Sequence, residues 1–146
     1  NSNILLQNTS NNTLTSFGGA TFKTMYINSC EITPNPTDFI SEQTFIASHN
    51  ILIPVDITNF AFDTLTRCFT GVVSVCIITS ISEFVEIIDL KCYQKSNSWY
   101  LNTSSVGDTT NIILSITNTG QIQYTLPHFS NWISTTIKYR GITTTI

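Results

Sequence analysis

The sequence predicts an all-β protein, an antiparallel sandwich or jelly-roll-like head that follows an extended N-terminal β arm. Three observations predict this class. The chain has 21 Ile, 24 Thr and nine Phe against three Ala and one Met, and β-branched and aromatic side chains suit a pleated surface better than a helix. Apolar and polar residues alternate in several segments that turn-forming residues separate. No segment keeps a 3.6-residue apolar period, so we expect no long helix.

Two hairpins are the clearest local signals. Apolar residues alternate with polar ones over 112–116 and again over 122–124, and the turn Asn118-Thr119-Gly120 lies between them. A second hairpin joins 69–79 to 84–93 through a short polar link. Both of its strands carry apolar residues on both faces, which predicts central strands that are covered on each side.

Shorter signals complete the head. Strands are expected over 44–47, 51–57, 99–102 and 133–140, with a short final piece over 142–146. Turn-rich segments separate them, notably 33–38 and 104–111. Seven or eight short strands at this spacing are typical of a sandwich or a jelly roll.

The first thirty residues differ from the rest. They consist mostly of Asn, Ser, Thr and aliphatic residues, and they are too few to build a core of their own. We therefore divide the chain into an arm over 1–30 and a head over 31–146, near Pro34 and Pro36, which interrupt strand pairing. Apolar side chains in such an arm favour packing against other copies of the chain along an axis.

Composition and charge exclude several classes of function. Six Lys and Arg stand against nine Asp and Glu, spread singly, so the chain has no basic surface for nucleic acid. No apolar run reaches the roughly 18 to 20 residues that cross a bilayer, so membrane insertion is not expected. The chain begins at Asn1 and its one methionine is Met25, which indicates a processed or excised piece of a longer protein.

The four cysteines leave two alternatives open. Cys30, Cys68, Cys76 and Cys92 show no C-x-x-C spacing, which disfavours a metal or redox site. Our first expectation is that the last three are buried free thiols that behave as small hydrophobes. The alternative is one disulfide between Cys68 and Cys92, across neighbouring strands.

Three sequons begin at Asn8, Asn11 and Asn102 and are candidate glycosylation sites. A chain with 14 Asn, 16 Ser and 24 Thr produces sequons by chance, so their weight is small.

No motif predicts catalysis, and we expect neither catalytic residues nor a cofactor or metal. His49 and His128 do not form an H-x-x-x-H arrangement, and no G-x-S-x-G or phosphate-binding glycine pattern is present. Carboxylate pairs such as Glu83 with Glu86, or Asp89 with Asp108, are more typical of solvated strand ends than of a glycosidase. A hydrolase on this fold would need one histidine beside a carboxylate in a cleft.

Aromatic residues in polar, turn-like segments are the better candidates for ligand binding. An exposed ring can pack on the apolar face of a sugar while nearby amides and hydroxyls bond its hydroxyl groups. The candidates lie in two segments: Trp99 and Tyr100, then His128, Phe129, Asn131 and Trp132. For either tryptophan, a place in the core or at a subunit interface is the more common role.

Two segments together resemble a known family. Residues 13–22, with Gly18-Gly19-Ala20, and then Met25-Tyr26-Ile27-Asn28 resemble the short β repeats of fibre-like proteins of giant, mimivirus-like DNA viruses. The run 119–125, followed by 132–140 and 142–144, resembles the end of the globular domain that often follows such repeats. The chain departs from that pattern at Leu126-Pro127-His128-Phe129 and in its four cysteines.

The resemblance implies the head of a virion fibre with a short shaft remnant before it. Such heads are typically homotrimers at the virion surface, and their loops contact a host glycan or protein receptor without enzymatic activity. The alternative is a secreted, extracellular carbohydrate-binding or adhesion domain of cellular origin, with occupied sequons and paired cysteines.

Overall fold

A computed structural model describes residues 25–27, 30–32 and 39–145. The chain divides into two compact units, Asn1–Pro34 and Asn35–Ile146. In the first unit, β1 (Met25–Ile27) pairs antiparallel with β2 (Cys30–Ile32). The rest of the expected arm and the sequons at Asn8 and Asn11 lie outside the described residues. The boundary expected after residue 30 stays a prediction.

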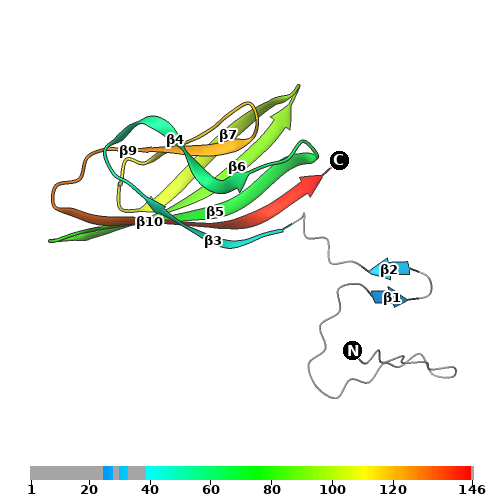
Figure 1. Ribbon diagram of the computed structural model, residues 1–146, viewed down its shortest axis with the longest axis horizontal. Coiled ribbons are helices and arrows are strands. Elements are labelled where there is room, and N and C mark those ends of the chain that lie inside the picture. The colour runs from blue at the N-terminus through cyan, green and yellow to red at the C-terminus, as the bar shows by residue number, and fades with distance from the viewer. Residues whose placement is uncertain (1–24, 28–29, 33–38, 146) are drawn as a thin grey trace, which may run out of the picture. The chain divides into compact units, whose positions relative to one another are not determined.

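The second unit is a sandwich of two antiparallel sheets, which confirms the predicted fold class (Figure 1). One sheet has the strand order β3-β10-β5-β6-β7, and the other has the order β4-β9-β8. The strands of the larger sheet are β3 (Phe39–Ala47), β10 (Trp132–Thr145), β5 (Thr66–Thr79), β6 (Glu83–Lys95) and β7 (Ser98–Gly107). Those of the smaller sheet are β4 (Ile51–Ala61), β9 (Gln121–Leu126) and β8 (Ile113–Ile116). The described residues contain no helix that is long and apolar enough to cross a membrane.

Both predicted hairpins are present, as β8–β9 and β5–β6. The separate final strand expected over 142–146 is wrong, because β10 runs unbroken through Gly141 and pairs with β5 along its length. The turn expected from residue 104 is also wrong in part, because β7 continues to Gly107 in register with β6. Both segments contain polar residues, but their pairing with a long neighbouring strand keeps the backbone in the β conformation.

Stacked aromatic rings join the two sheets. Phe60 of β4 stacks on Tyr139 of β10, with ring centroids 3.8 Å apart and planes 1° apart. The Tyr139 hydroxyl donates a hydrogen bond to the carbonyl oxygen of Thr58 at 3.2 Å. Phe69 and Phe62 extend this cluster toward Trp99. Tyr139 therefore ties the middle of β10 to β4 through ring packing and through a hydrogen bond.

A glycine pair makes room for one of these rings. Gly71 on β5 faces Gly141 on β10 in the ladder, and the Phe69 ring lies against both. A Cβ atom on either glycine would overlap the Phe69 ring, and one on Gly141 would also lie 2.6 Å from the carbonyl oxygen of Thr70. Both positions thus need glycine for close packing.

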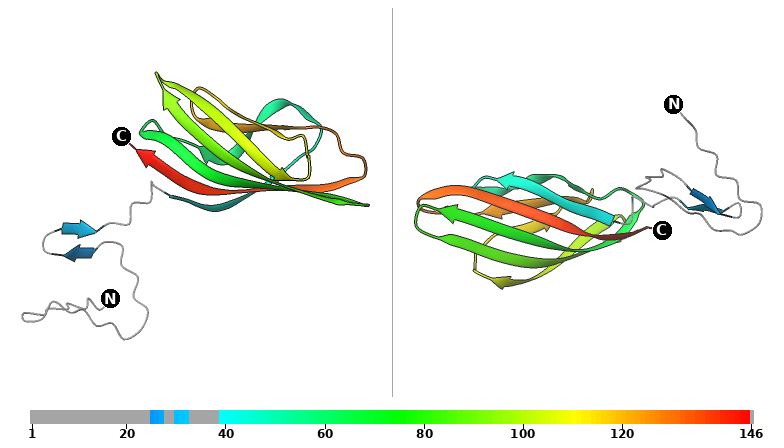
Figure 2. Two further views of the ribbon diagram at one scale, coloured as in Figure 1. Left: turned by 180° about the vertical axis from the view of Figure 1, so that it is seen from behind. Right: turned by 90° about the horizontal axis from the view of Figure 1, so that it is seen from below.

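Among residues 39–145, the larger sheet is covered on one face only. Its inner face packs on β4, β9 and β8, while the right-hand view of Figure 2 looks onto its open outer face. β5 and β6 occupy central places in the sheet, as their sequences predict. The prediction that both faces of these strands are covered is not met within the described part of the single chain.

The cysteines of β5 and β6 are free thiols. Cys68 pairs with Tyr93 and Phe69 pairs with Cys92, so Cys68 lies on the outer face and Cys92 on the inner face. Side chains on opposite faces of a sheet cannot meet, so the alternative of a Cys68–Cys92 disulfide is wrong. Cys92 is buried, which raises its pKa to about 12, whereas Cys68 and Cys76 are half-buried.

Candidate functional site

The head has two distinct ends. Phe39, where β3 begins, pairs with Ile142 near the end of β10, whereas Ala47 at the end of β3 pairs with Thr135 near the start of β10. The loops 48–50, 80–82 and 127–131 therefore gather at the end opposite the start of β3. We call this the distal end; it lies on the left in Figure 1.

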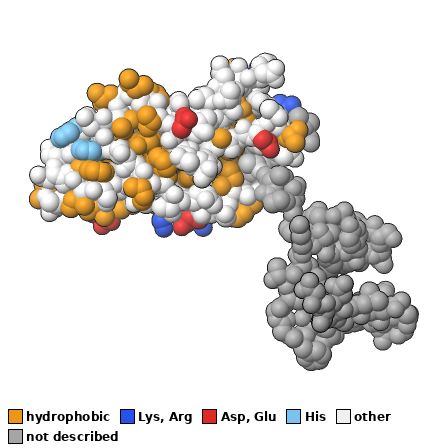
Figure 3. Space-filling model, in the orientation of Figure 1, with side chains coloured by type: hydrophobic (Ala, Val, Ile, Leu, Met, Phe, Trp, Pro, Cys, Tyr) orange, Lys and Arg blue, Asp and Glu red, His pale blue; other side chains and the backbone are white. Residues whose placement is uncertain are grey.

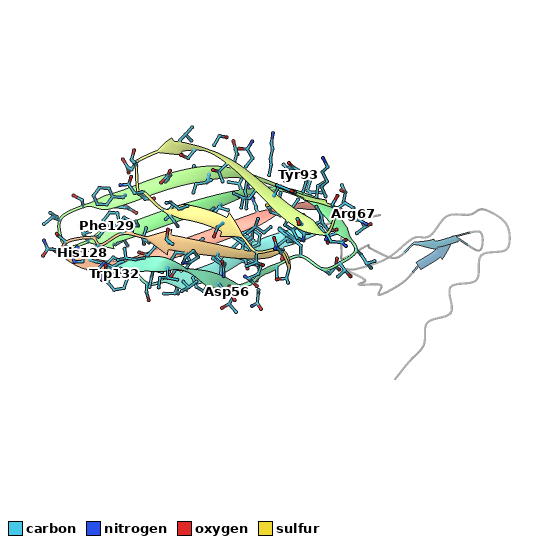
Figure 4. The ribbon with its side chains drawn as sticks, turned by 90° about the horizontal axis from the view of Figure 1, so that it is seen from above. Asp56, Arg67, Tyr93, His128, Phe129 and Trp132 are labelled. Atoms are coloured by element: carbon cyan, nitrogen blue, oxygen red, sulfur yellow. The ribbon has the colours of Figure 1, made fainter. Side chains whose placement is uncertain are left out.

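Four aromatic side chains, from two of these loops and from the first residue of β10, form a cluster at the distal end. His49 stacks on Trp132 with centroids 4.4 Å apart and planes 6° apart, and the His128 ring lies 5.3 Å from His49. Phe129 packs edge-on against Phe84 at 5.5 Å. Figure 4 shows His128, Phe129 and Trp132 together, and Figure 3 shows both histidines on the surface. The distal cluster comprises His49, His128, Phe129 and Trp132.

Backbone hydrogen bonds hold the loops beside one another. The Asn50 amide donates to the Pro127 carbonyl at 3.2 Å, and the Ser80 amide donates to the Asn131 carbonyl at 2.9 Å. Asn50 and Asn131 both adopt positive φ, at 58° and 56°. Asparagine tolerates this conformation better than other residues with a side chain, which explains its place in both turns.

Side-chain hydrogen bonds orient the rings. The Trp132 Nε1–H donates to Thr135 Oγ1 at 2.8 Å, and the Phe129 amide donates to His49 Nδ1 at 3.3 Å. The indole thus has its polar atom satisfied by β10, and His49 keeps Nε2 available. His128 and Asn131 are exposed, and no hydrogen bond to another described residue occupies their side chains.

With histidine counted as neutral, the distal loops carry no formal charge. None of the residues 48–50, 80–82 and 127–131 is Lys, Arg, Asp or Glu. The surface combines aromatic rings with an imidazole, an amide and the Ser130 hydroxyl. Such a set suits a neutral, polyhydroxylated ligand, which offers both apolar C–H faces and hydroxyl groups.

The remaining candidates lie elsewhere. Trp99 is only 6% exposed and packs on Phe62 at 4.9 Å, so it is a core residue whose edge reaches a polar hollow of about 290 Å³. Tyr100 points to the outer face of the sheet, where it stacks on Tyr93 at 5.1 Å. The six candidates therefore do not form one site. Asn102 of the third sequon is exposed on β7.

The distal cluster includes one residue outside the predicted ligand-binding set. His49 lies far before the segment 128–132 in the sequence, and only the pairing of β3 with β10 brings them together. The polar turn Ser48-His49-Asn50 between two expected strands was the sequence signal available for it.

The carboxylates considered as a glycosidase pair are separated. Glu83 and Asp89 point to the outer face of β6, whereas Glu86 points inward and is buried. Asp108 Oδ2 accepts a hydrogen bond from the Val85 amide at 2.8 Å. Within residues 39–145, neither histidine hydrogen-bonds to a carboxylate. The described residues also hold no group of three metal-binding side chains.

Glu86 anchors the connection between β7 and β8. Its carboxylate accepts hydrogen bonds from the Thr110 amide at 3.0 Å and from the Thr110 hydroxyl. Burial raises the pKa of Glu86, but these bonds and one from the Ser105 side chain outweigh it and leave the pKa below its usual value. Glu86 thus stays ionised at neutral pH as a structural acceptor.

The fold and the distal cluster together define a β-sandwich domain whose loops at one end carry aromatic rings and no Lys, Arg, Asp or Glu. No protein-family model matches the chain, and no curated protein sequence matches it. Among solved structures, the chain is similar to the tailspike protein of the Acinetobacter phage vB_ApiP_P1, with a TM-score of 0.47 and 11% identity. The match covers 88% of this chain and 25% of the tailspike chain, so the chain spans about a quarter of that protein's length.

Proposed function

We propose that the chain is the head of a homotrimeric viral attachment fibre, located at the virion surface, whose distal loops bind a neutral host glycan. The observation that carries the proposal is the distal cluster, which lies at the end of the head opposite the start of β3. If the stem of the fibre joins the head at the start of β3, these loops point away from the stem. The resemblance of the arm and of the C-terminal segment to giant-virus fibres supports the same function.

In this function the head binds and does not catalyse. The exposed His128 ring and the part of the Trp132 indole that His49 leaves uncovered contact the sugar, while Asn131, Ser130 and His49 Nε2 offer hydrogen bonds to its hydroxyl groups. The carboxylates of Glu83, Glu86 and Asp89 take no part in binding.

The experiment is a glycan array of neutral and acidic saccharides, followed by titration of the best ligand against the full chain. We expect neutral glycans to bind, and Trp132→Ala or His128→Ala to weaken binding about tenfold or more. Ile113→Ser, at an exposed apolar position on β8, is the matched control and leaves binding unchanged. Unchanged binding in both cluster variants, with their folds intact, would overturn the proposal.

The cellular alternative shares the glycan-binding surface and differs in processing. The exposed Asn102 is the observation that favours it, because a glycan fits there without disturbing the core. Intact mass of the protein from its natural source separates the two, since glycan mass on Asn102 supports a secreted domain and an unmodified chain supports the fibre head.

A further inference from the structure

The outer face of the larger sheet carries exposed apolar side chains on all five of its strands. On the two central strands β5 and β6, Ile78, Val85 and Ile87 are 41–43% exposed. Toward the edge strand β3 the exposure is greater, at Ile46 (71%), Phe39 (58%) and Ile142 (61%). A surface with this many apolar side chains in neighbouring ladders is typical of a contact surface.

The sequence of the central strands points the same way. β5 and β6 carry apolar residues on both faces, a pattern typical of strands covered on each side. The smaller sheet covers only the inner face. A second covering layer is therefore needed to satisfy the pattern, and it has to come from outside the described part of this chain.

The outer face is hollowed along β5. The outward side chains of β5 are short at Thr70, Val72 and Ser74, between longer ones on β6 and β10. Two hollows, of about 540 and 240 Å³, lie along this strand, and both are lined by Val72 and Arg140. We call them together the β5 groove. It can accept a ridge of side chains from another surface.

The strands β6 and β10 form the two banks of the β5 groove, and one row across the groove carries opposite charges on these two banks. Asp89 on β6, Val72 on β5 and Arg140 on β10 lie in one row of the ladders. Among the described residues, neither Asp89 nor Arg140 forms an ion pair, whereas Lys138 and Glu42 pair with each other at 3.3 Å. The other outward charges on β6 are Glu83, which accepts a hydrogen bond from the Cys76 thiol, Lys91 and Lys95.

This charge pattern is complementary to itself. A second copy rotated about an axis parallel to the strands brings its β6 bank toward the β10 bank of the first copy. Asp89 of one copy then faces Arg140 of the next, and Val85 and Ile87 of β6 pack into the groove. The same axis keeps the starts of β3 at one end of the assembly and all distal clusters at the other.

We propose that the outer face of the larger sheet is the surface through which copies of this chain associate, with Asp89 of one copy paired to Arg140 of its neighbour. This deepens the proposed function, because it names the surface that forms the oligomer. The β5 groove is thus filled by Val85 and Ile87 on β6 of a second copy.

The test is the mass of the full chain in solution by light scattering and sedimentation. We expect the native chain to be a trimer at micromolar concentration and Ile87→Glu to shift it to monomer. Asp89→Arg and Arg140→Asp each raise the dissociation constant about tenfold or more, and the double variant Asp89→Arg/Arg140→Asp returns it to within about threefold of the native value.

Asp56→Arg is the control, because Asp56 is exposed on the smaller sheet, where it bonds to Gln123 at 2.8 Å. It leaves the mass unchanged, and circular dichroism checks that every variant is folded. A native chain that is monomeric at about 100 μM, or an Ile87→Glu variant that keeps the native mass, overturns the proposal. If the single charge variants associate normally, the Asp89–Arg140 pairing is wrong.

Glycan titration of the same variants separates this proposal from the function of the distal cluster. Affinity for a monovalent saccharide should not change when the chain becomes monomeric, because no residue of the cluster lies on β5 or β6. Loss of the oligomer with intact binding supports both proposals. An intact oligomer without any glycan binding removes the function and keeps the interface.

Discussion

The imidazole ring of His49 lies flat against the indole ring of Trp132, with 4.4 Å between the ring centroids. This contact joins the loop after β3 to the first residue of β10. The Trp132 indole is the largest ring in the distal cluster, and its orientation thus depends on a side chain from another part of the sequence.

Replacing His49 should therefore loosen Trp132. In a Trp99→Phe background, Trp132 is the sole tryptophan, because the chain has two. His49→Ala should shift its fluorescence to longer wavelength and weaken glycan binding, since the stack is lost. His49→Phe keeps a ring at this position and should retain most of both properties. Equal fluorescence spectra for the protein with His49 and for its His49→Ala and His49→Phe variants would contradict the stacking.

Glu86→Gln should lower the free energy of unfolding by about 1–3 kcal/mol at pH 7, because the bonds from Thr110 then reach a neutral acceptor. The pKa of Glu86 is lower in the folded chain than in the unfolded one. Its stabilising effect is therefore complete above the unfolded pKa of about 4.3 and is lost as pH falls through the folded pKa.

Urea unfolding at several pH values measures this effect. The difference between native and Glu86→Gln protein should shrink as the solution is acidified. The control is Glu42→Gln, which removes an exposed ion pair with Lys138 and should cost less than about 1 kcal/mol. A pH-independent loss in Glu86→Gln would mean that the carboxylate charge is not what Thr110 recognises.

Gly141→Ala should destabilise the head by about 1–3 kcal/mol, because its Cβ atom overlaps the Phe69 ring and crowds the Thr70 carbonyl. Thermal unfolding measures the change. Thr125→Ala, on the smaller sheet and outside the core cluster, is the comparison and should unfold close to the native temperature. A Gly141→Ala variant as stable as the native chain would show that Phe69 does not occupy this space.

The thiols should differ in reactivity. Cys92 is buried and its pKa is raised to about 12, so it should resist alkylation at pH 8 until the chain unfolds. Cys68, which is half-buried on the outer face, should react faster. Peptide mapping after timed alkylation measures each cysteine separately. A disulfide-linked peptide containing Cys68 and Cys92 would contradict the assignment of these residues to opposite faces.

Local patterns predicted the fold class and both hairpins, because alternation and turn residues are properties of neighbours in sequence. They did not predict that β10 would continue through Gly141, since its continuity depends on pairing with β5. Opposite faces for Cys68 and Cys92 require the register of two strands, which an even spacing in sequence does not fix across a hairpin.

The site was predictable in part for the same reason. His128, Phe129, Asn131 and Trp132 share one loop and the start of one strand, so sequence proximity found them together. Trp99 and Tyr100 are adjacent in sequence, yet alternation along β7 sends one inward and the other outward. His49 enters the cluster only through the β3–β10 ladder.

The unbroken β10 also decides how the head would carry a pulling force. A load applied between the start of β3 and a ligand held at the distal loops runs parallel to the strands. It therefore shears the β3–β10 ladder, whose hydrogen bonds lie across the direction of pull and must fail together. A head built this way yields much later under tension than one whose strands can be unzipped one bond at a time.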